Sequence, residues 1–172
     1  GTIEASANGD PVGKWTDYSG QGNHFLQSGD TALKPRIMAN AINGLPAIKF
    51  DGVDDRLSIA YNSTLNPNHL QLYIVFYMPN TASWRVLNHS DVGYRIYKYN
   101  SNFSTNTANS SDTNIYIPAK YGAAIARLKY DRTRIAWKVS GVSEVTRANT
   151  AAISGANPLI LADVTFDQWI YG

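Results

Sequence analysis

The stretch at 43–57, NGLPAIKFDGVDDRL, has the pattern of a strand, a tight turn and a second strand. The apolar side chains that make this pattern on the two sides of the turn are Ala47, Ile48, Phe50, Leu57 and Ile59. Asp51-Gly52 reverses the chain between them, because glycine adopts positive φ without a Cβ clash. The stretch therefore predicts a β-hairpin around which the rest of the chain is organised.

The composition of the chain favours a single all-β domain. Only two glutamates occur in the 172 residues, and 13 glycines and 7 prolines separate short β-branched and aromatic runs. A chain of this length buries about two thirds of its unfolded surface in one core, so we expect one domain over 1–172. Because the sequence stops in a strand that Trp169-Ile170-Tyr171 begins, we expect this domain to be a fragment of a longer polypeptide.

Alternating apolar residues place the strands. The clearest is at 70–78, where both faces are apolar or aromatic, which predicts a central strand covered on both sides. The other expected strands are at 24–26, 85–87, 94–99, 123–130, 134–139, 142–146, 159–161 and 169–171. The segment 100–114 is nearly all Asn, Ser and Thr, with Phe103 its only large apolar residue before Ile115, and it predicts a long surface loop.

Charge and apolar length exclude several partners. The formal net charge of +2 comes from scattered Lys and Arg, so no nucleic acid is expected. No apolar run approaches about 18 residues, so no membrane insertion is expected. The chain has no cysteine and therefore neither a disulfide framework nor a thiolate metal site.

Spaced motifs in the first third carry a family resemblance. They are Trp15-x-Asp17-x-Ser19-Gly20-x-Gly22-Asn23, Gln27, Pro35, Asn43-Gly44-x-Pro46-Ala47 and Phe50-Asp51-Gly52-x-Asp54-Asp55-x-Leu57. Together they resemble the opening half of the concanavalin A-like lectin/glucanase superfamily. More specifically, they are similar to laminin G-like jelly-roll modules of bacterial surface proteins and of phage fibre and decoration proteins. The region 127–145, with Ser140-Gly141 at its turn, is similar to a later part of that family.

The resemblance implies a two-sheet antiparallel β-sandwich of the jelly-roll type, with about six or seven strands in each sheet and one concave face. Two elements of the family pattern are missing from the sequence. One is a Trp-x-Asp-Ala strand before the first motif, and the other is a final strand after Trp169-Ile170-Tyr171. Both departures agree with a fragment.

Hydrolysis is the first chemistry to weigh, because glucanases belong to the resembled superfamily. A glycosidase needs two carboxyl groups flanking the scissile bond, and those glucanases carry Glu-x-Asp-x-x-Glu on one strand. Here Glu4 and Glu144 stand alone. Asp51, Asp54 and Asp55 lie in a predicted turn, where hydrogen bonding to the backbone is the favoured interpretation. The sequence therefore does not predict an enzyme.

The same three aspartates offer the hard oxygen ligands that Ca²⁺ takes, but without EF-hand spacing, so a turn without metal is favoured. Three histidines, His24, His69 and His89, are far apart in the sequence and are expected on the surface or in loops rather than as zinc ligands. No cofactor is therefore predicted, and calcium is the one ion that the sequence leaves open.

A candidate sugar site rests on aromatic residues. If Ile96 faces the core, then Arg95, Tyr97 and Tyr99 point outward together, and Trp84 is expected to join them. Sugar rings stack on such aromatic faces while their hydroxyls bond to polar neighbours. Cross-strand tyrosines beside arginine stems also stabilise sheets without any ligand, so both interpretations stay open.

The function that these observations favour is non-catalytic recognition or attachment, on a larger extracellular or virion-surface protein, with a glycan or host-surface carbohydrate as ligand. The alternative is a purely structural fibre or capsid-decoration module that packs against other virion or surface-protein subunits. A glycoside hydrolase is the third choice. A homo-oligomer is compatible with each of these. Trp15 and Trp137 are expected in the core, and Trp169 in the core or an interface.

Overall fold

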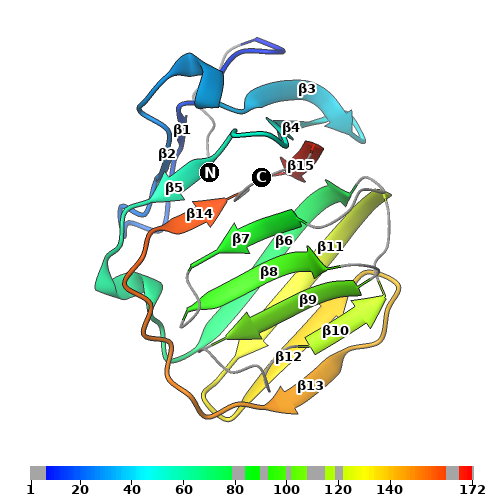
Figure 1. Ribbon diagram of the computed structural model, residues 1–172. Helices are drawn as coiled ribbons and strands as arrows, with labels where there is room; N and C mark the ends of the chain where they lie inside the picture. The colour runs from blue at the N-terminus through cyan, green and yellow to red at the C-terminus, as the bar shows by residue number, and fades with distance from the viewer. Residues whose placement is uncertain are drawn as a thin grey trace.

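The chain folds into two packed sheets of antiparallel strands, as the computed structural model shows (Figure 1). The structure describes residues 7–78, 84–89, 93–99, 102–107, 115–118, 122–161 and 167–171, and at a few strand positions only the backbone. Within these residues the helical segments are two short 3-10 turns, η1 (Thr31–Leu33) and η2 (Ser63–Leu65), so no described helix could cross a membrane. The prediction of an all-β two-sheet sandwich is confirmed.

Eight strands form the first sheet. In spatial order they are β1 (Lys14–Trp15), β2 (Phe25–Leu26), β5 (Leu57–Ile59), β14 (Leu159–Leu161), β7 (Trp84–Asn88), β8 (Tyr94–Tyr99), β9 (Asn102–Thr107) and β10 (Ile115–Pro118). β14 comes from near the end of the chain and separates β5 from β7. The sheet is therefore completed by segments far apart in the sequence.

Seven strands form the second sheet. In spatial order they are β13 (Val145–Ala148), β12 (Arg134–Val139), β11 (Gly122–Tyr130), β6 (Leu70–Met78), β15 (Asp167–Tyr171), β4 (Leu45–Asp51) and β3 (Arg36–Ile42). Here β15 is the late strand that lies between two early ones, β4 and β6. The family resemblance implied about six or seven strands per sheet, and the first sheet has one more than that.

The core between the sheets is centred on three stacked rings. Phe103 of β9 lies between Phe76 of β6 and Trp137 of β12, with ring centroids 5.2 Å and 5.5 Å apart and nearly parallel planes. All three side chains are fully buried. Trp137 is a core residue as predicted, whereas Trp15 is half-buried at the edge of the core.

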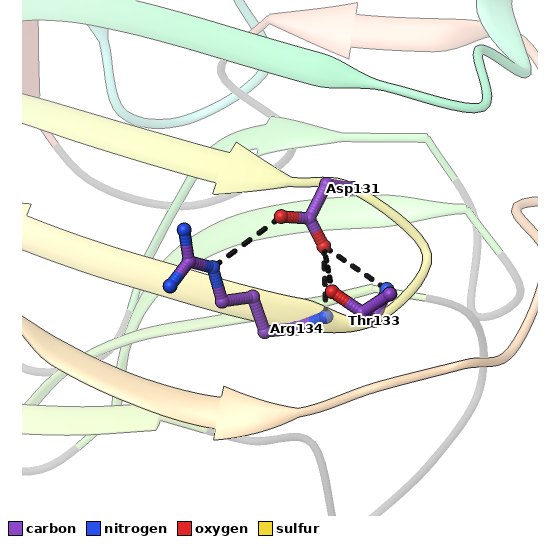
Figure 2. A network of polar contacts seen from close by, with 3 residues as sticks. All are labelled: Asp131, Thr133 and Arg134. Carbon is purple, nitrogen blue, oxygen red and sulfur yellow. Dashed lines mark hydrogen bonds and ion pairs between the residues drawn. The ribbon is translucent and has the colours of Figure 1, made fainter.

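β11 and β12 form where the sequence predicts strands, and they pair as a hairpin whose turn is shown in Figure 2. Asp131 accepts hydrogen bonds from the backbone N–H groups of Thr133 and Arg134, each at 3.0 Å, and pairs with the Arg134 side chain at 3.3 Å. The Thr133 hydroxyl also donates to Asp131 and is the main reason why the pKa of that carboxyl falls to about 2. The carboxylate holds the turn while Arg132 adopts positive φ.

The predicted hairpin about Asp51-Gly52 is wrong. β4 belongs to the second sheet and β5 to the first, so this turn carries the chain from one layer to the other. The hairpin instead joins β3 to β4 about Asn43 and Gly44, where both residues have positive φ and Ile42 pairs with Leu45. That geometry suits the twist of two adjacent antiparallel strands.

The predicted loop at 100–114 is also wrong in its first half. Residues 102–107 form β9, which pairs with β8 on one side and with β10 on the other. Phe103, Thr105 and Thr107 are buried on the core side, and the Thr105 hydroxyl donates to the Arg95 carbonyl at 2.7 Å. Threonine is β-branched and satisfies its own hydroxyl here, so a polar composition still forms a core strand. Residues 108–114 lie outside the described part of the chain.

The prediction that both faces of the central strand β6 are covered is wrong, because one of them faces solvent. Its outer face carries Tyr73, Val75 and Tyr77, and the tyrosines are 55% and 42% exposed. Ile125 of the neighbouring β11 stands in register with Val75 and is 51% exposed. An apolar surface of four side chains therefore faces outward from the middle of the second sheet.

The buried position of Phe103 leads to a stability prediction. Phe103→Ala removes the ring that joins β9 to the second sheet, and we expect it to lower the free energy of unfolding by about 3–5 kcal/mol. Its neighbour Asn102 is half-buried, and Asn102→Ala should change stability by no more than about 0.5 kcal/mol. Urea denaturation followed by tryptophan fluorescence measures both changes. Equal small losses of stability in the two variants would contradict the core strand and support a surface loop at 102–107.

Candidate functional site

The outer face of β8, β9 and β10 carries a row of side chains across three strands. Tyr97 stands in register with Ser104, and Ser104 with Tyr116. Ile96 on β8 is fully buried in the core, so its neighbours Arg95 and Tyr97 lie on the opposite face of the sheet. The predicted outward orientation of Arg95 and Tyr97 is therefore what the strand shows.

The row is held together by contacts between its own side chains. Tyr97 and Tyr116 are close enough for their hydroxyl groups to interact, and Ser104 is buried in the row between them. The Arg95 guanidinium carbon lies 5.5 Å from the centroid of the Tyr97 ring, within cation–π range. Burial, and then the neighbouring Tyr116, raise the pKa of the Tyr97 hydroxyl. That hydroxyl therefore stays protonated at neutral pH. We call Arg95, Tyr97, Ser104 and Tyr116 the tyrosine row.

Two of the four predicted site residues are only partly described. Trp84 and Tyr99 lie in β7 and β8, but their side chains are outside the described part of the structure. In the backbone register Trp84 pairs with Lys98, whereas Arg85 is the residue across from Tyr97. The structure thus brings Arg95 and Tyr97 together and leaves the roles of Trp84 and Tyr99 as predictions.

Tyr116 is the member of the row that the sequence analysis missed. It is 46% exposed and lies on β10, a strand that was not predicted at all. The available signal was the short apolar alternation at 115–117, which follows directly on the segment taken as a loop. Only the pairing of β9 with both neighbours places Tyr116 beside Tyr97.

The acidic turn between β4 and β5 has the hydrogen bonding that its sequence predicts. Asp51 accepts backbone N–H bonds from Val53, Asp54 and Asp55 at 2.9, 3.3 and 3.2 Å, and Asp55 accepts the Asp51 N–H at 2.9 Å. Burial, followed by the repulsion of Asp51 and Asp54, raises the pKa of Asp55 to about 6. The turn uses these carboxylates to fix the backbone.

The three carboxylates also come close enough together to be considered as a metal site. Oxygen atoms of Asp51, Asp54 and Asp55 lie within 4.8 Å of one another. These hard oxygen ligands suit Ca²⁺, but one Asp51 oxygen already accepts three backbone donors. The expectation of a turn without metal therefore stays a prediction, and calcium stays the one ion that the sequence leaves open.

The Trp15 motif builds a loop beside a small hollow of about 210 Å³. Asp17 accepts hydrogen bonds from the backbone of Ser19 at 2.8 Å and of Asn23 at 2.9 Å, and these donors lower its pKa. The Asn23 amide in turn donates to Thr64 at 2.9 Å. The motif is accounted for by these bonds, which tie the loop to itself and to the 3-10 turn η2.

His89 lies just after β7, outside the strands, as expected of a loop residue, but it is fully buried there. Its Nε2 lies 3.0 Å from the Asn66 amide oxygen, and its ring packs against Tyr61 and Tyr94. Burial lowers the pKa of His89, so the ring is neutral at pH 7. Gly93 fits closely against it, because a Cβ there would lie 2.4 Å from the His89 carbonyl oxygen.

Comparison with known proteins shows the fold and not the family. No protein-family model matches the chain, and no curated protein sequence matches it. Solved structures do match. The binding domain of Paraclostridial Mosquitocidal Protein 1 is similar at a TM-score of 0.68 and 12% identity, over 94% of this chain and 44% of that one.

Two further structures extend the range of functions on this fold. One is botulinum neurotoxin type C, described for a cell entry that depends on two ganglioside molecules (TM-score 0.54, 10% identity, 88% of this chain and 44% of that one). The other is a GH54 α-L-arabinofuranosidase soaked with a cyclic sulfate inhibitor (TM-score 0.64, 13% identity, 94% and 46%). The chain spans less than half the length of each matched chain. At these identities the likeness establishes the β-sandwich alone.

The raised pKa of Asp55 predicts a pH dependence of stability. The folded state takes up a proton below about pH 6, whereas the unfolded chain does so only near its ordinary value of 3.8. Folded protein therefore binds more protons between about pH 4 and 6, and the contribution of Asp55 to stability falls as pH rises through that window. Asp55→Asn keeps a side-chain oxygen that can accept the Asp51 N–H. Because the amide does not titrate, the loss of stability with rising pH should disappear.

We expect Asp55→Asn to gain about 1–3 kcal/mol relative to the unsubstituted chain on going from about pH 4.5 to about pH 7.5. Urea denaturation at the two pH values measures the difference, and parallel behaviour of the two proteins would contradict it. Millimolar CaCl₂ at the higher pH tests the ion separately. A rise in the unfolding midpoint that Asp55→Asn lacks would show that the turn binds calcium.

Proposed function

We propose that this chain is a non-catalytic recognition module that binds glycans through the tyrosine row. The observation that carries the proposal is the joining of Tyr97 to Tyr116 across Ser104, with Arg95 over the Tyr97 ring. Two aromatic rings and a cation on the same outer face match what a sugar offers, because its C–H faces stack on rings and its hydroxyls take polar contacts.

The similar solved structures support a recognition role for this fold. One is the binding domain of Paraclostridial Mosquitocidal Protein 1, and the botulinum neurotoxin type C structure concerns interaction with ganglioside molecules. For this chain we propose an extracellular or virion-surface location on a larger protein. We also propose membership of the concanavalin A-like superfamily, in its laminin G-like branch, on the strength of the Trp15 and Asp51 motifs.

A structural module is the second candidate, and one observation favours it. The exposed apolar surface of Tyr73, Val75, Tyr77 and Ile125 is of the kind that neighbouring subunits cover in a fibre or capsid. Under this alternative the tyrosine row would also be an interface. The two candidates differ in what meets Tyr97 and Tyr116, a soluble glycan or another protein surface.

Hydrolysis is the third candidate, because the GH54 α-L-arabinofuranosidase has a similar fold. Against it, Glu144 is paired with Arg127, and Asp51 is held by backbone donors in a tight turn. Asp51 and Asp55 have pKa values displaced in opposite directions, as an acid and base pair would, but burial and turn bonding account for both. We expect no turnover of β-glucans or arabinofuranosides.

A glycan array tests the proposed function. Tyr97→Ala with Tyr116→Ala removes both rings, and we expect at least about a tenfold loss of affinity, or about 1.4 kcal/mol, for any glycan that the chain retains. The matched control is Tyr73→Ala, an exposed tyrosine on the other sheet, which should bind normally.

An array without a retained glycan, or equal binding by the double variant, would remove the glycan proposal. Cross-linking of the chain to neighbouring subunits through the tyrosine row would then support the structural module. Thermal unfolding of both variants checks that lost binding does not reflect lost folding.

A further inference from the structure

Ala136 of β12 faces outward from the second sheet and is nevertheless buried. Its neighbours Ile135 and Trp137 are fully buried in the core, so Ala136 lies on the opposite face of the strand, where it is only 5% exposed. A side chain of one carbon is covered on an outer face only when longer side chains stand around it. The surface over Ala136 is accordingly a hollow with a volume of about 360 Å³.

The hollow lies across three neighbouring strands and the start of a fourth. Gln71 of β6, Lys129 of β11 and Ala136 of β12 stand side by side in the register of these strands, and all three line it. Arg134 of β12 and Glu144, which directly precedes β13, line it as well. β15 lies beyond these strands, on the other side of β6. The hollow is therefore formed without β15.

Both carboxylates at the hollow are already engaged by arginine side chains. Asp131, in the turn between β11 and β12, faces the Nε of Arg134 at 3.3 Å and also accepts backbone donors. Glu144 is paired with Arg127, a residue of β11. The negative charges of the two carboxylates are therefore balanced within the protein.

The cations of the hollow are in excess over these carboxylates. Lys129 is half-buried, and its ammonium group forms no ion pair within the described part of the chain. Arg134 contacts Asp131 through Nε, and Figure 2 shows its two terminal nitrogens directed away from that carboxylate. The exposed His69, which also lines the hollow, counts as neutral in the formal charge at pH 7. Once the two ion pairs cancel, Lys129 leaves the hollow with one positive charge.

We propose that this hollow binds a small monocarboxylate that carries hydroxyl groups, the chemistry of a sugar acid such as a uronic acid. The carboxylate would accept hydrogen bonds from the Lys129 ammonium and from the terminal nitrogens of Arg134. The hydroxyl groups would donate to Glu144 and to the amide oxygen of Gln71, whose amide nitrogen already donates to Tyr73 at 2.9 Å. Small-molecule sites range from about 300 to 1,000 Å³, so the volume suits one sugar ring.

The charge balance distinguishes this class of ligand from others. A phosphate dianion would bring a second negative charge to a hollow that offers one positive charge in excess. An amine would meet Lys129 and would find Asp131 and Glu144 already paired. A neutral sugar would cover the half-buried ammonium without supplying a charged partner. One carboxylate is therefore the best match, and this conclusion is independent of the tyrosine row, which lies on the other sheet.

The proposal is tested by titrating the 172-residue chain with methyl glucuronide and following its backbone amides by NMR. The neutral control is methyl glucoside, which has the same ring with a hydroxymethyl group in place of the carboxylate. We expect saturable shifts at the amides of Gln71, Lys129 and Ala136 with the glucuronide, and at least about tenfold weaker binding of the glucoside. Glucose 6-phosphate and glucosamine should also bind more weakly than the glucuronide.

A pair of lysine variants on the same face of the sheet provides the matched control. Lys129→Gln removes the charge in excess and should weaken glucuronide binding by at least about tenfold. Lys138→Gln makes the same change in net charge at an exposed residue of β12 that does not line the hollow, and it should bind normally. Ala136→Leu fills the hollow without changing any charge and should abolish binding.

Thermal unfolding reports whether each variant folds. If Ala136→Leu does not fold, the two lysine variants and the comparison of the glucuronide with the glucoside still decide the question. The paired change Tyr97→Ala with Tyr116→Ala should leave glucuronide binding at the hollow intact, whether or not the tyrosine row binds glycans.

Four outcomes would overturn the proposal. Absence of glucuronide binding, or equal binding of the glucuronide and the glucoside, would show that the hollow does not recognise a carboxylate. Equal losses in Lys129→Gln and Lys138→Gln would reduce the effect to general charge attraction. Tighter binding of glucose 6-phosphate would make the hollow a phosphate site. Glucuronide shifts confined to β8, β9 and β10, and lost with Tyr97 and Tyr116, would assign the acidic sugar to the tyrosine row.

Discussion

The stacking of Phe103 between Phe76 and Trp137 is the contact on which the position of the candidate glycan site depends. Phe103 belongs to the first sheet, and its two partners belong to the second. Burying this ring fixes the faces of β9, because a strand that directs Phe103 inward must direct Ser104 outward. β9 lies between the strands that carry Tyr97 and Tyr116, so the outer row depends on a packing contact in the core.

Much of the architecture could be predicted from residue patterns. The alternation at 134–139 gives the buried side of β12 correctly, and Asp131 with its two neighbours marks the turn that precedes this strand. These features are local, because a side chain bonds to backbone two or three residues away. The motif around Asp51 also predicts its own hydrogen bonds correctly. Hydrogen bonds between residues close in the sequence can therefore be predicted, and so can the choice of strand over helix.

Features that depend on distant pairing could not be predicted in the same way. The turn at Asp51-Gly52 has the residues of a hairpin, but whether the next strand pairs with β4 or crosses to the other sheet depends on β14 and β15, more than 90 residues later. Residues 102–107 have the composition of a loop, and only their place between β8 and β10 makes them a strand. Half of the candidate site, Arg95 and Tyr97, followed from alternation, whereas Tyr116 required the sheet register.

The placement of β14 and β15 has a consequence for how the chain reaches its fold. β14 is inserted between β5 and β7, and β15 between β4 and β6, so each layer is closed in its interior by a strand that follows all its other strands in the sequence. Neither layer can be completed until residues 159–171 have been synthesised. Assembly must bring together ends separated by most of the chain, and topologies of that kind fold slowly. During that delay the early strands would present open edges, when a chaperone or a neighbouring chain has the greatest access to them.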